Sequence, residues 1–281
     1  MPGTLYVVAT PIGNLEDITL RALRVLREVD AIAAEDTRHT GKLLSHFGIS
    51  TPTISFHEHN TRTRTPQLVA RLEAGESLAL VTDAGTPGVS DPGVELIGAC
   101  VRAGIRVDPL PGPSAPLAAA IASGFRVVPL TVLGFAPSRV KDRTAFLRSV
   151  AETSHTVTFF EAPHRIRATL EEAAVILGER PIVVARELTK KYQEFMRGAA
   201  RDIVGHTTNA RGEFTIVVGP AIHTDSRTPP VTDADIVAEF GHMSKCAAHT
   251  RRGTVAAVAR KFGKSAREVY AAVERAKRVV E

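Results

Sequence analysis

Short apolar runs that end in loops rich in proline and glycine dominate the first half of the sequence, and this alternation restricts the fold more than any other feature. The runs cover residues 5–10, 31–34 and 77–82, and a further strand is predicted over residues 105–110, with helical patterns and turn residues between them. Strands buried on both faces are continuously apolar, and chains that alternate them with helices form parallel sheets with crossover helices. The sequence therefore predicts an α/β fold.

The first crossover illustrates the pattern. Thr19 is predicted to cap a helix whose buried face carries Leu20, Leu23, Leu26 and Val29. A later helix is predicted to end near Gly48, and a helix of small residues near Gly124.

A chain of 281 residues is long enough for about two domains at roughly 150 residues each. The composition changes after Phe125, and strands are predicted near residues 156–160, 182–185, 194–197 and 214–218, with a helix over 166–177. We therefore expect an N-terminal α/β domain (residues 1–125), a second α/β domain (126–220), a linker (221–232) and a helical unit (233–281).

Several classes of protein are disfavoured. No apolar run approaches the ~18 residues of a membrane span, and the first residues lack the pattern of a secretory signal, so we expect a cytoplasmic protein without a membrane partner. Cys100 and Cys246 are too few for a disulfide framework. His57 and His59 are predicted to share one face of a strand, with Glu58 on the other face and no third ligand nearby, so no metal site is expected.

Three loops carry the strongest functional signal, because each follows a predicted strand of the same sheet. They cover residues 10–14, 83–93 and 111–115, and the second combines three Gly, two Pro and two Asp in eleven residues. Ligands of open α/β sheets bind at the carboxyl ends of strands, where glycine lets the backbone approach closely. Each loop alone is also compatible with a simple turn, but together they predict a small-molecule cleft.

The common nucleotide-binding fingerprints are missing. No Gly-x-Gly-x-x-Gly follows the first strand. The segment Phe262 to Ser265 resembles the end of a phosphate-binding loop, but the glycine that such a loop requires at position 258 is replaced by Val258. ATP and NAD are therefore disfavoured.

A family resemblance rests on motifs that occur in a characteristic order and spacing. They are PIGNL at residues 11–15, EDTR at 35–38, DAGTPGVSDPG at 83–93, PGPSA at 111–115, FEAPHR at 160–165 and ARELTKK at 185–191. Over about residues 4–220 the chain resembles the bacterial small-subunit ribosomal RNA methyltransferases of the tetrapyrrole methylase-like class of S-adenosylmethionine enzymes.

The resemblance implies two α/β domains of the tetrapyrrole methylase type, with a cleft between them that binds S-adenosylmethionine, and usually a homodimer. The implied reaction is methylation of the ribose 2′-hydroxyl of a cytidine in the decoding region of small-subunit (16S) ribosomal RNA, either free or in the assembled subunit. The donor pocket carried over by motif comprises Pro11, Ala84, Gly85, Thr86, Val89, Ser114 and Ala115, with Glu161, Ala162 and Leu188 from the second domain.

Methyl transfer to a hydroxyl needs an in-line oxygen and a group that takes its proton, but no metal. The candidate bases, each near a predicted strand end, are Asp83, Glu187, Asp36 and His164. The candidate phosphate-binding residues near the acceptor are Arg38, Arg165, Arg186, Lys190 and Lys191. Structural ion pairs, a loop-orienting role for Asp83 and a capping role for His164 remain alternatives.

The C-terminal tail concentrates the positive charge of the chain. Residues 244–281 carry a net charge of +7. Because the whole chain carries +5, residues 1–243 carry −2. The tail reads as two helices joined at Gly263, with a small core of Val255, Val258, Ala259, Phe262, Val269 and Tyr270. Its exposed cations, expected to contact RNA as helix-turn-helix units contact nucleic acids, are Arg251, Arg252, Arg260, Lys261, Lys264 and Arg267. A basic bundle that only increases solubility is the alternative.

The sequence is also compatible with two other functions. The same pocket could serve a methyltransferase of tetrapyrrole or corrinoid precursors, although those enzymes have Gly-Gly-Asp-Pro where this chain has Ala84-Gly85-Thr86-Pro87. The chain could also be a nucleic-acid-binding protein without catalytic activity. The basic tail and the altered loop favour the RNA methyltransferase.

Overall fold

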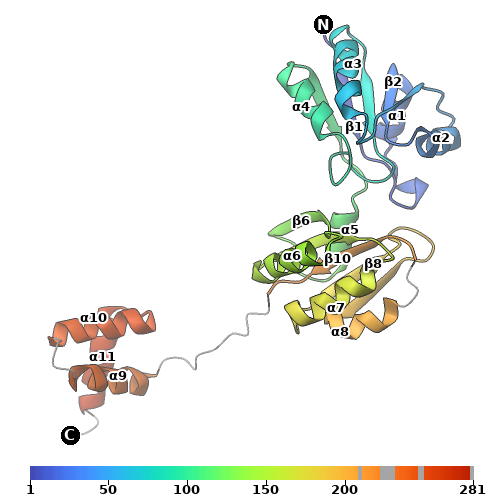
Figure 1. Cartoon of the computed structure of the whole chain (residues 1–281). Coiled ribbons are helices and arrows are strands. Elements are labelled where there is room, and N and C mark those ends of the chain that lie inside the picture. The colour runs from blue at the N-terminus through green and yellow to red at the C-terminus, as the bar shows by residue number, and fades with distance from the viewer. Residues whose placement is uncertain (208–210, 222–231, 246–249, 279–281) are drawn as a thin grey trace. The chain divides into compact units, whose positions relative to one another are not determined.

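The computed structural model describes residues 1–207, 211–221, 232–245 and 250–278. The chain divides into two compact units, Met1–Ala221 and Ile222–Glu281. The first unit contains two five-stranded sheets, and the second contains helices (Figure 1). The α/β fold class predicted from the sequence is confirmed.

The first sheet is parallel throughout, as the apolar runs predicted. Its strands lie in the order β3 (Thr53–Ser55), β2 (Ala31–Ala34), β4 (Leu78–Val81), β1 (Thr4–Val8) and β5 (Arg106–Leu110). Because all five run in one direction, their carboxyl ends meet at a single edge of the sheet.

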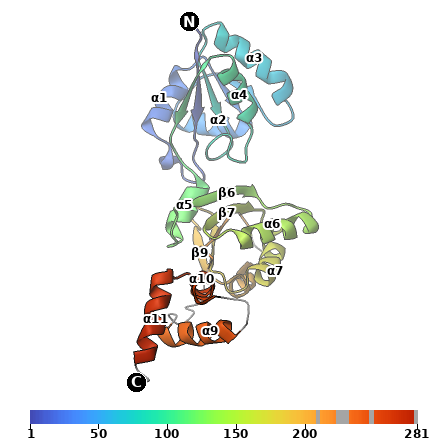
Figure 2. The same cartoon turned by 90° about the vertical axis from the view of Figure 1, so that its left-hand side faces the viewer.

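Helices cover both faces of this sheet (Figure 2). Helices α1 (Leu20–Glu28) and α2 (Thr37–His46) pack on one face around Leu26 and Ile32. Helices α3 (Thr61–Glu73) and α4 (Val94–Arg102) pack on the other around Leu72 and Leu80. Burial on both faces explains why β2 and β4, whose residues are all buried, contain only apolar residues. The edge strand β5 is less buried and carries Arg106 and Asp108.

Two local predictions need correction. Thr19 caps α1 as predicted, accepting a hydrogen bond from the Ala22 amide at 3.1 Å. The buried face of α1, however, consists of Ala22, Val25 and Leu26, and Leu20 is 86% exposed because the helix is rotated relative to the predicted face. Residues 57–59 lie in a turn before α3 rather than on a strand, since β3 ends at Ser55.

The second sheet is mixed. Its order is β6 (Leu130–Phe135), β7 (Thr156–Glu161), β10 (Phe214–Val218), β8 (Ile182–Arg186) and β9 (Glu194–Gly198). β6 and β7 are parallel, and the remaining neighbours are antiparallel.

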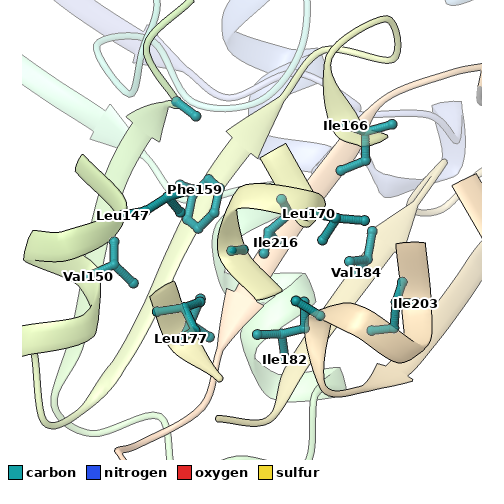
Figure 3. Close-up of a cluster of buried hydrophobic side chains, with 14 of the residues drawn as sticks. Leu147, Val150, Phe159, Ile166, Leu170, Leu177, Ile182, Val184, Ile203 and Ile216 are labelled. Carbon is teal, nitrogen blue, oxygen red and sulfur yellow. The ribbon is translucent and has the colours of Figure 1, made fainter. Parts of the chain in front are cut away.

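Alternating side chains of the second sheet supply two different cores. Ile182 and Val184 of β8 face helices α6 (Val140–Glu152), α7 (Ile166–Leu177) and α8 (Ala200–Ile203), as Figure 3 shows for the labelled side chains. Val183 and Ala185 face the opposite way, toward a cluster that includes Ala119 of α5 (Ala115–Ala122) and Ile12. The period-two alternation thus joins the second sheet to elements that follow β1 and β5.

The second unit contains α9 (Asp233–Lys245), α10 (Arg251–Phe262) and α11 (Ala266–Arg278). Gly263 ends α10 in the left-handed conformation, as the predicted turn requires. The core contains Val255, Val258 and Val269 as predicted, together with Ile236 of α9. Tyr270 was wrongly placed in this core: it is 50% exposed, and the Arg251 guanidinium lies over its ring at 5.5 Å.

Within the described ranges, no helix is both long and apolar enough to span a membrane. The predicted linker over residues 221–232 lies almost entirely outside the described residues.

A buried arginine joins three segments of the second sheet's domain. Arg180, which is 6% exposed, donates to the carbonyl oxygens of Gly219 at 2.8 Å, Val150 at 2.8 Å and His155 at 3.0 Å. Burial lowers the pKa of its guanidinium. One side chain thus satisfies carbonyl groups in the last turn of α6, in the segment after α6 and directly after β10.

We predict that Arg180→Met lowers the free energy of unfolding by about 2–4 kcal/mol, because several buried carbonyl groups lose their donor. Urea denaturation at pH 7 measures the change. Arg167→Met is the matched control, since Arg167 is exposed and pairs with Glu171 at the surface, and a change below about 0.5 kcal/mol is expected. Equal effects of the two substitutions would contradict the structural role of Arg180.

Candidate functional site

Hydrogen bonds tie the loops after β1, β4 and β5 to one another. Thr10 and Gly85 form a reciprocal backbone pair, with N···O distances of 2.9 Å and 3.0 Å. The Thr10 hydroxyl donates to the carbonyl oxygen of Thr82 at 3.1 Å, and the Thr86 hydroxyl donates to that of Pro113 at 3.2 Å. Gly85 has φ of +83°, a conformation that favours glycine at this contact. The three loops singled out in the sequence therefore form one connected surface.

The ends of β2 and β4 are joined through carboxylates. The Glu35 carboxylate accepts the Asp83 amide at 3.3 Å, and the Asp83 carboxylate accepts the Asp36 amide at 3.1 Å. This geometry supports the alternative in which Asp83 orients a loop.

These loops and the second sheet enclose a cavity of about 420 Å³, within the roughly 300–1,000 Å³ of small-molecule sites. The first sheet's loops and α5 contribute Ile12, Glu35, Asp83, Ala84, Gly85, Thr86, Val89, Ser90, Asp91, Ser114, Ala115 and Pro116. The second domain contributes Phe135, Phe160, Glu161, Ala162, Pro163, Leu188, Glu213, Phe214 and Thr215. The cleft between the two α/β domains, predicted with the fold, is present.

The structure brings together almost all of the predicted donor-pocket residues. The predicted donor-pocket residues that line the cavity are Ala84, Gly85, Thr86, Val89, Ser114, Ala115, Glu161, Ala162 and Leu188. Pro11 is not among them, and the next residue, Ile12, lies in the wall instead. The carboxylate of Glu161 is fully buried and accepts hydrogen bonds from Arg165, Thr169 and its neighbouring amide, so this residue supports the wall from behind.

Of the predicted proton acceptors, Asp83 lines the cavity, and Asp36, Glu187 and His164 do not. The Asp36 carboxylate caps α2 through the Arg38 amide at 2.8 Å, and this hydrogen bond lowers its pKa. Burial tends to raise the pKa of Glu187, but hydrogen bonds from Lys190 and the Glu213 amide hold it below the usual value. His164 is exposed beside α7.

The predicted phosphate-binding residues near the cleft fall into two groups. Arg38 and Lys191 are exposed, the former with 89% of its side chain accessible. Arg165, Arg186 and Lys190 are partly exposed and contact other groups of the protein, namely Glu161, the Arg211 carbonyl oxygen and Glu187, respectively. In the second unit, the predicted cations Arg251, Arg252, Arg260, Lys261, Lys264 and Arg267 are all exposed. Arg251 pairs with Glu274, and Lys261 pairs with Glu239.

Sequence reasoning missed the aromatic wall and three acidic residues, Glu35, Asp91 and Glu213. Phe135, Phe160 and Phe214 come from strand ends of the second sheet, where no motif marked Phe135 or Phe214. Glu35 and Asp91 lie inside motifs that the sequence already marked as functional, so their positions beside Asp83 were the available signal.

The cavity wall concentrates negative charge on one side. Burial, followed by the charges of Glu35 and Asp83, raises the pKa of Asp91 to about 6, opposed in part by the Thr82 hydroxyl. Burial also raises the pKa of Glu35, although the Asp83 amide and the nearby His57 favour its charged form. No group of three or more potential metal ligands occurs in the ranges that the structure describes.

Comparison with known proteins gives one family and one fold. Residues 4–204 match the family model of the tetrapyrrole (corrin/porphyrin) methylases. The chain is 50% identical over 226 residues to a ribosomal RNA small subunit methyltransferase I of Synechocystis sp., covering 79% of this chain and 81% of the relative. It is 47% identical over 218 residues to the protein of that name from Bacillus subtilis, covering 77% and 75%.

Solved structures with lower identity share the fold. A uroporphyrin-III C-methyltransferase from Thermus thermophilus matches with a TM-score of 0.57 and 21% identity, over 78% of this chain and 96% of that one. Another structure of a Thermus thermophilus uroporphyrin-III C-methyltransferase, in complex with S-adenosylhomocysteine, matches with a TM-score of 0.56 and 18% identity, over 78% and 99%.

We predict that Asp91→Asn stabilises the protein near neutral pH. A carboxyl group whose pKa rises from 3.8 to about 6 on folding opposes folding when it is charged. The penalty is absent below about pH 4, grows as the pH rises through 6, and is complete above it. Because the group is partly exposed to solvent, we expect a gain of about 1–2 kcal/mol at pH 7.5.

Thermal unfolding at pH 4 and pH 7.5 measures this effect. Glu73→Gln, on the exposed end of α3, is the control and should change stability little at either pH. A gain that is the same at both values would show that charge burial is not its cause.

Proposed function

We propose that this member of the tetrapyrrole (corrin/porphyrin) methylase family is an S-adenosylmethionine-dependent RNA methyltransferase. Within the family, the chain belongs to the ribosomal RNA small subunit methyltransferase I proteins. The acceptor is the ribose 2′-hydroxyl of a cytidine in the decoding region of small-subunit ribosomal RNA. The observation that carries the proposal is the cavity that the three strand-end loops and the second sheet form together.

The residues of the cavity fit the methyl donor. Apolar side chains, including Val89, Phe160 and Leu188, suit a nucleoside that must be removed from water. The Asp83 carboxylate favours a cationic sulfonium over its neutral product. Backbone groups of the loop around Gly85 are held close to the cavity by the contact with Thr10.

The reaction asks little of the protein beyond placement. The acceptor oxygen must lie in line with the methyl group and the departing sulfur, and a nearby group must take the hydroxyl proton. Among the predicted proton acceptors, Asp83 lies at the cavity, whereas Glu187 is kept ionised by Lys190.

The RNA partner is proposed to bind through exposed cations of the second unit. Arg252, Arg260, Lys264 and Arg267 are exposed on α10, α11 and the turn between them. Phosphate contacts of this kind position a nucleic acid without reading its sequence. A homodimer and a cytoplasmic location complete the proposal.

Methyl transfer from isotopically labelled S-adenosylmethionine tests the function directly. Small ribosomal subunits, naked ribosomal RNA and a tetrapyrrole precursor are assayed in parallel, and the labelled nucleoside is identified by mass spectrometry. Label on a cytidine ribose supports the proposal, and the better RNA substrate identifies the assembly state. Label on the tetrapyrrole alone would replace the proposed acceptor, and donor binding without any transfer would favour a non-catalytic RNA-binding protein.

We predict that Ala84→Phe reduces S-adenosylmethionine affinity at least tenfold, because the larger ring occupies part of the cavity. Ala84 is exposed and has no left-handed backbone conformation, so the protein should remain folded. Isothermal calorimetry measures the affinity and circular dichroism the fold. Ala145→Phe, at an exposed position of α6, is the control, and unchanged donor affinity in Ala84→Phe would remove this loop from the donor site.

We predict that simultaneous substitution of Arg252, Arg260, Lys264 and Arg267 by alanine weakens RNA binding and flattens its salt dependence. Each lost phosphate contact lowers the slope of log affinity against log salt by about 0.7–0.9. The control replaces four exposed cations of the first unit, Arg24, Lys141, Arg148 and Arg167, and should leave the slope nearly unchanged. Equal slopes for the two variants would exclude a specific role for the second unit.

A further inference from the structure

Three carboxylates line the same side of the cavity, and their surroundings differ. Glu35 follows β2, Asp83 follows β4, and Asp91 lies farther along the loop that begins at Asp83. A methyltransferase acting on a hydroxyl needs one proton acceptor here, and the structure distinguishes among the three.

Two of the carboxylates are committed to holding the loops together. Glu35 accepts the Asp83 amide, and Asp83 accepts the Asp36 amide. Taking up a proton on the accepting oxygen would weaken the backbone contact at the strand ends. Asp91 carries no such backbone contact in the described part of the chain, and it lines the cavity together with the other two residues.

The backbone around Asp91 holds its side chain in the wall of the cavity. Ser90 has φ of +68°, an uncommon conformation for a residue other than glycine, and Gly93 with φ of +140° precedes α4. A Cβ atom at Gly134 of β6 would lie 2.9 Å from the Ser90 hydroxyl, so the second sheet contacts the loop immediately before Asp91. Strained backbone of this kind is common at functional sites.

We propose that Asp91 is the catalytic proton acceptor for the ribose 2′-hydroxyl and that Glu35 and Asp83 are positioning residues that set its basicity. This inference rests on the proposed function. In the step, the hydroxyl oxygen forms a bond to the methyl carbon, and the carbon–sulfur bond breaks. Its electron pair stays on the sulfur, giving neutral S-adenosylhomocysteine. The hydroxyl proton passes to the Asp91 carboxylate and then to solvent.

The electrostatics of the cavity support this assignment. The pKa of Asp91 is raised to about 6 by burial and by Glu35 and Asp83, so near neutral pH the group is ionised and still basic enough to accept a proton. Other titratable groups around the cluster are His57, next to Glu35, and Glu213, which lines the cavity and pairs with Lys190.

The first experiment compares Asp91→Asn with the natural chain under saturating donor and small ribosomal subunits. We expect kcat to fall by about 10²- to 10⁴-fold, as for loss of a general base, while the calorimetric Kd for S-adenosylmethionine changes less than about threefold. Asp91→Glu should retain more activity than Asp91→Asn, because it keeps the carboxylate. Asp142→Asn on the exposed start of α6 is the control.

The second experiment measures the dependence of kcat/KM on pH. A purely structural role for Asp91 would not produce the loss of activity near pH 6 or its shift in Glu35→Gln. The natural chain should lose activity below about pH 6, as Asp91 becomes protonated. In Glu35→Gln the loss should occur at lower pH, because one neighbouring negative charge that raises the pKa of Asp91 has been removed. The glutamine retains an oxygen that can accept the Asp83 amide.

The outcomes separate this inference from the proposed function. Label on cytidine with the natural chain, together with near-normal kcat in Asp91→Asn, overturns the role of Asp91 alone. An acid limb that is unchanged in Glu35→Gln overturns the coupling between the two carboxylates. Absence of methylated RNA with the natural chain overturns the proposed function and this role with it.

Discussion

A reciprocal backbone pair between Thr10 and Gly85 fixes the geometry on which the rest of the site depends. It joins the chain beyond β1 to the chain beyond β4, two strands that are neighbours in the sheet although β1 ends at Val8 and β4 begins at Leu78. The carboxylate contacts between the ends of β2 and β4 extend the same edge, and the Thr86 hydroxyl adds the loop after β5. Loops with this many mutual contacts can present backbone groups to a ligand without being ordered by it, which lowers the entropic cost of binding.

The two sheets contribute different chemistry to the cavity. The parallel sheet provides carboxylates and glycine-rich backbone at its carboxyl edge, whereas the mixed sheet provides Phe160, Phe214 and Leu188. The mixed sheet can do so because successive side chains of its strands point to opposite faces. Phe159 fills the core beneath α6 and α7, and Phe160 is free to line the cavity. A polar wall opposite an apolar wall suits a donor that is both a nucleoside and a cation.

The carboxylates of Glu35 and Asp91 beside the cavity oppose folding when they are ionised. Burial and mutual repulsion raise the pKa of Asp91 and of Glu35, so their ionised forms reduce stability near neutral pH. Such clusters are common where a protein must stabilise positive charge or move a proton. Arg180 shows the opposite arrangement, because its buried charge is surrounded by carbonyl groups and stabilises the fold.

The sequence by itself determined the parallel sheet, the three loops and most of the cavity wall, because continuous apolar strands and strand-end glycines are local patterns with few structural solutions. It also placed α7 and the Gly263 turn correctly. Only the tertiary structure decided which polar residues reach the cavity. Asp36, Glu187 and Arg165 have suitable chemistry and suitable positions in the sequence, but contacts with Arg38, Lys190 and Glu161 hold their side chains elsewhere. The direction of a side chain depends on partners that are distant in the sequence, and for that reason the place of Asp91 became visible only in the folded chain.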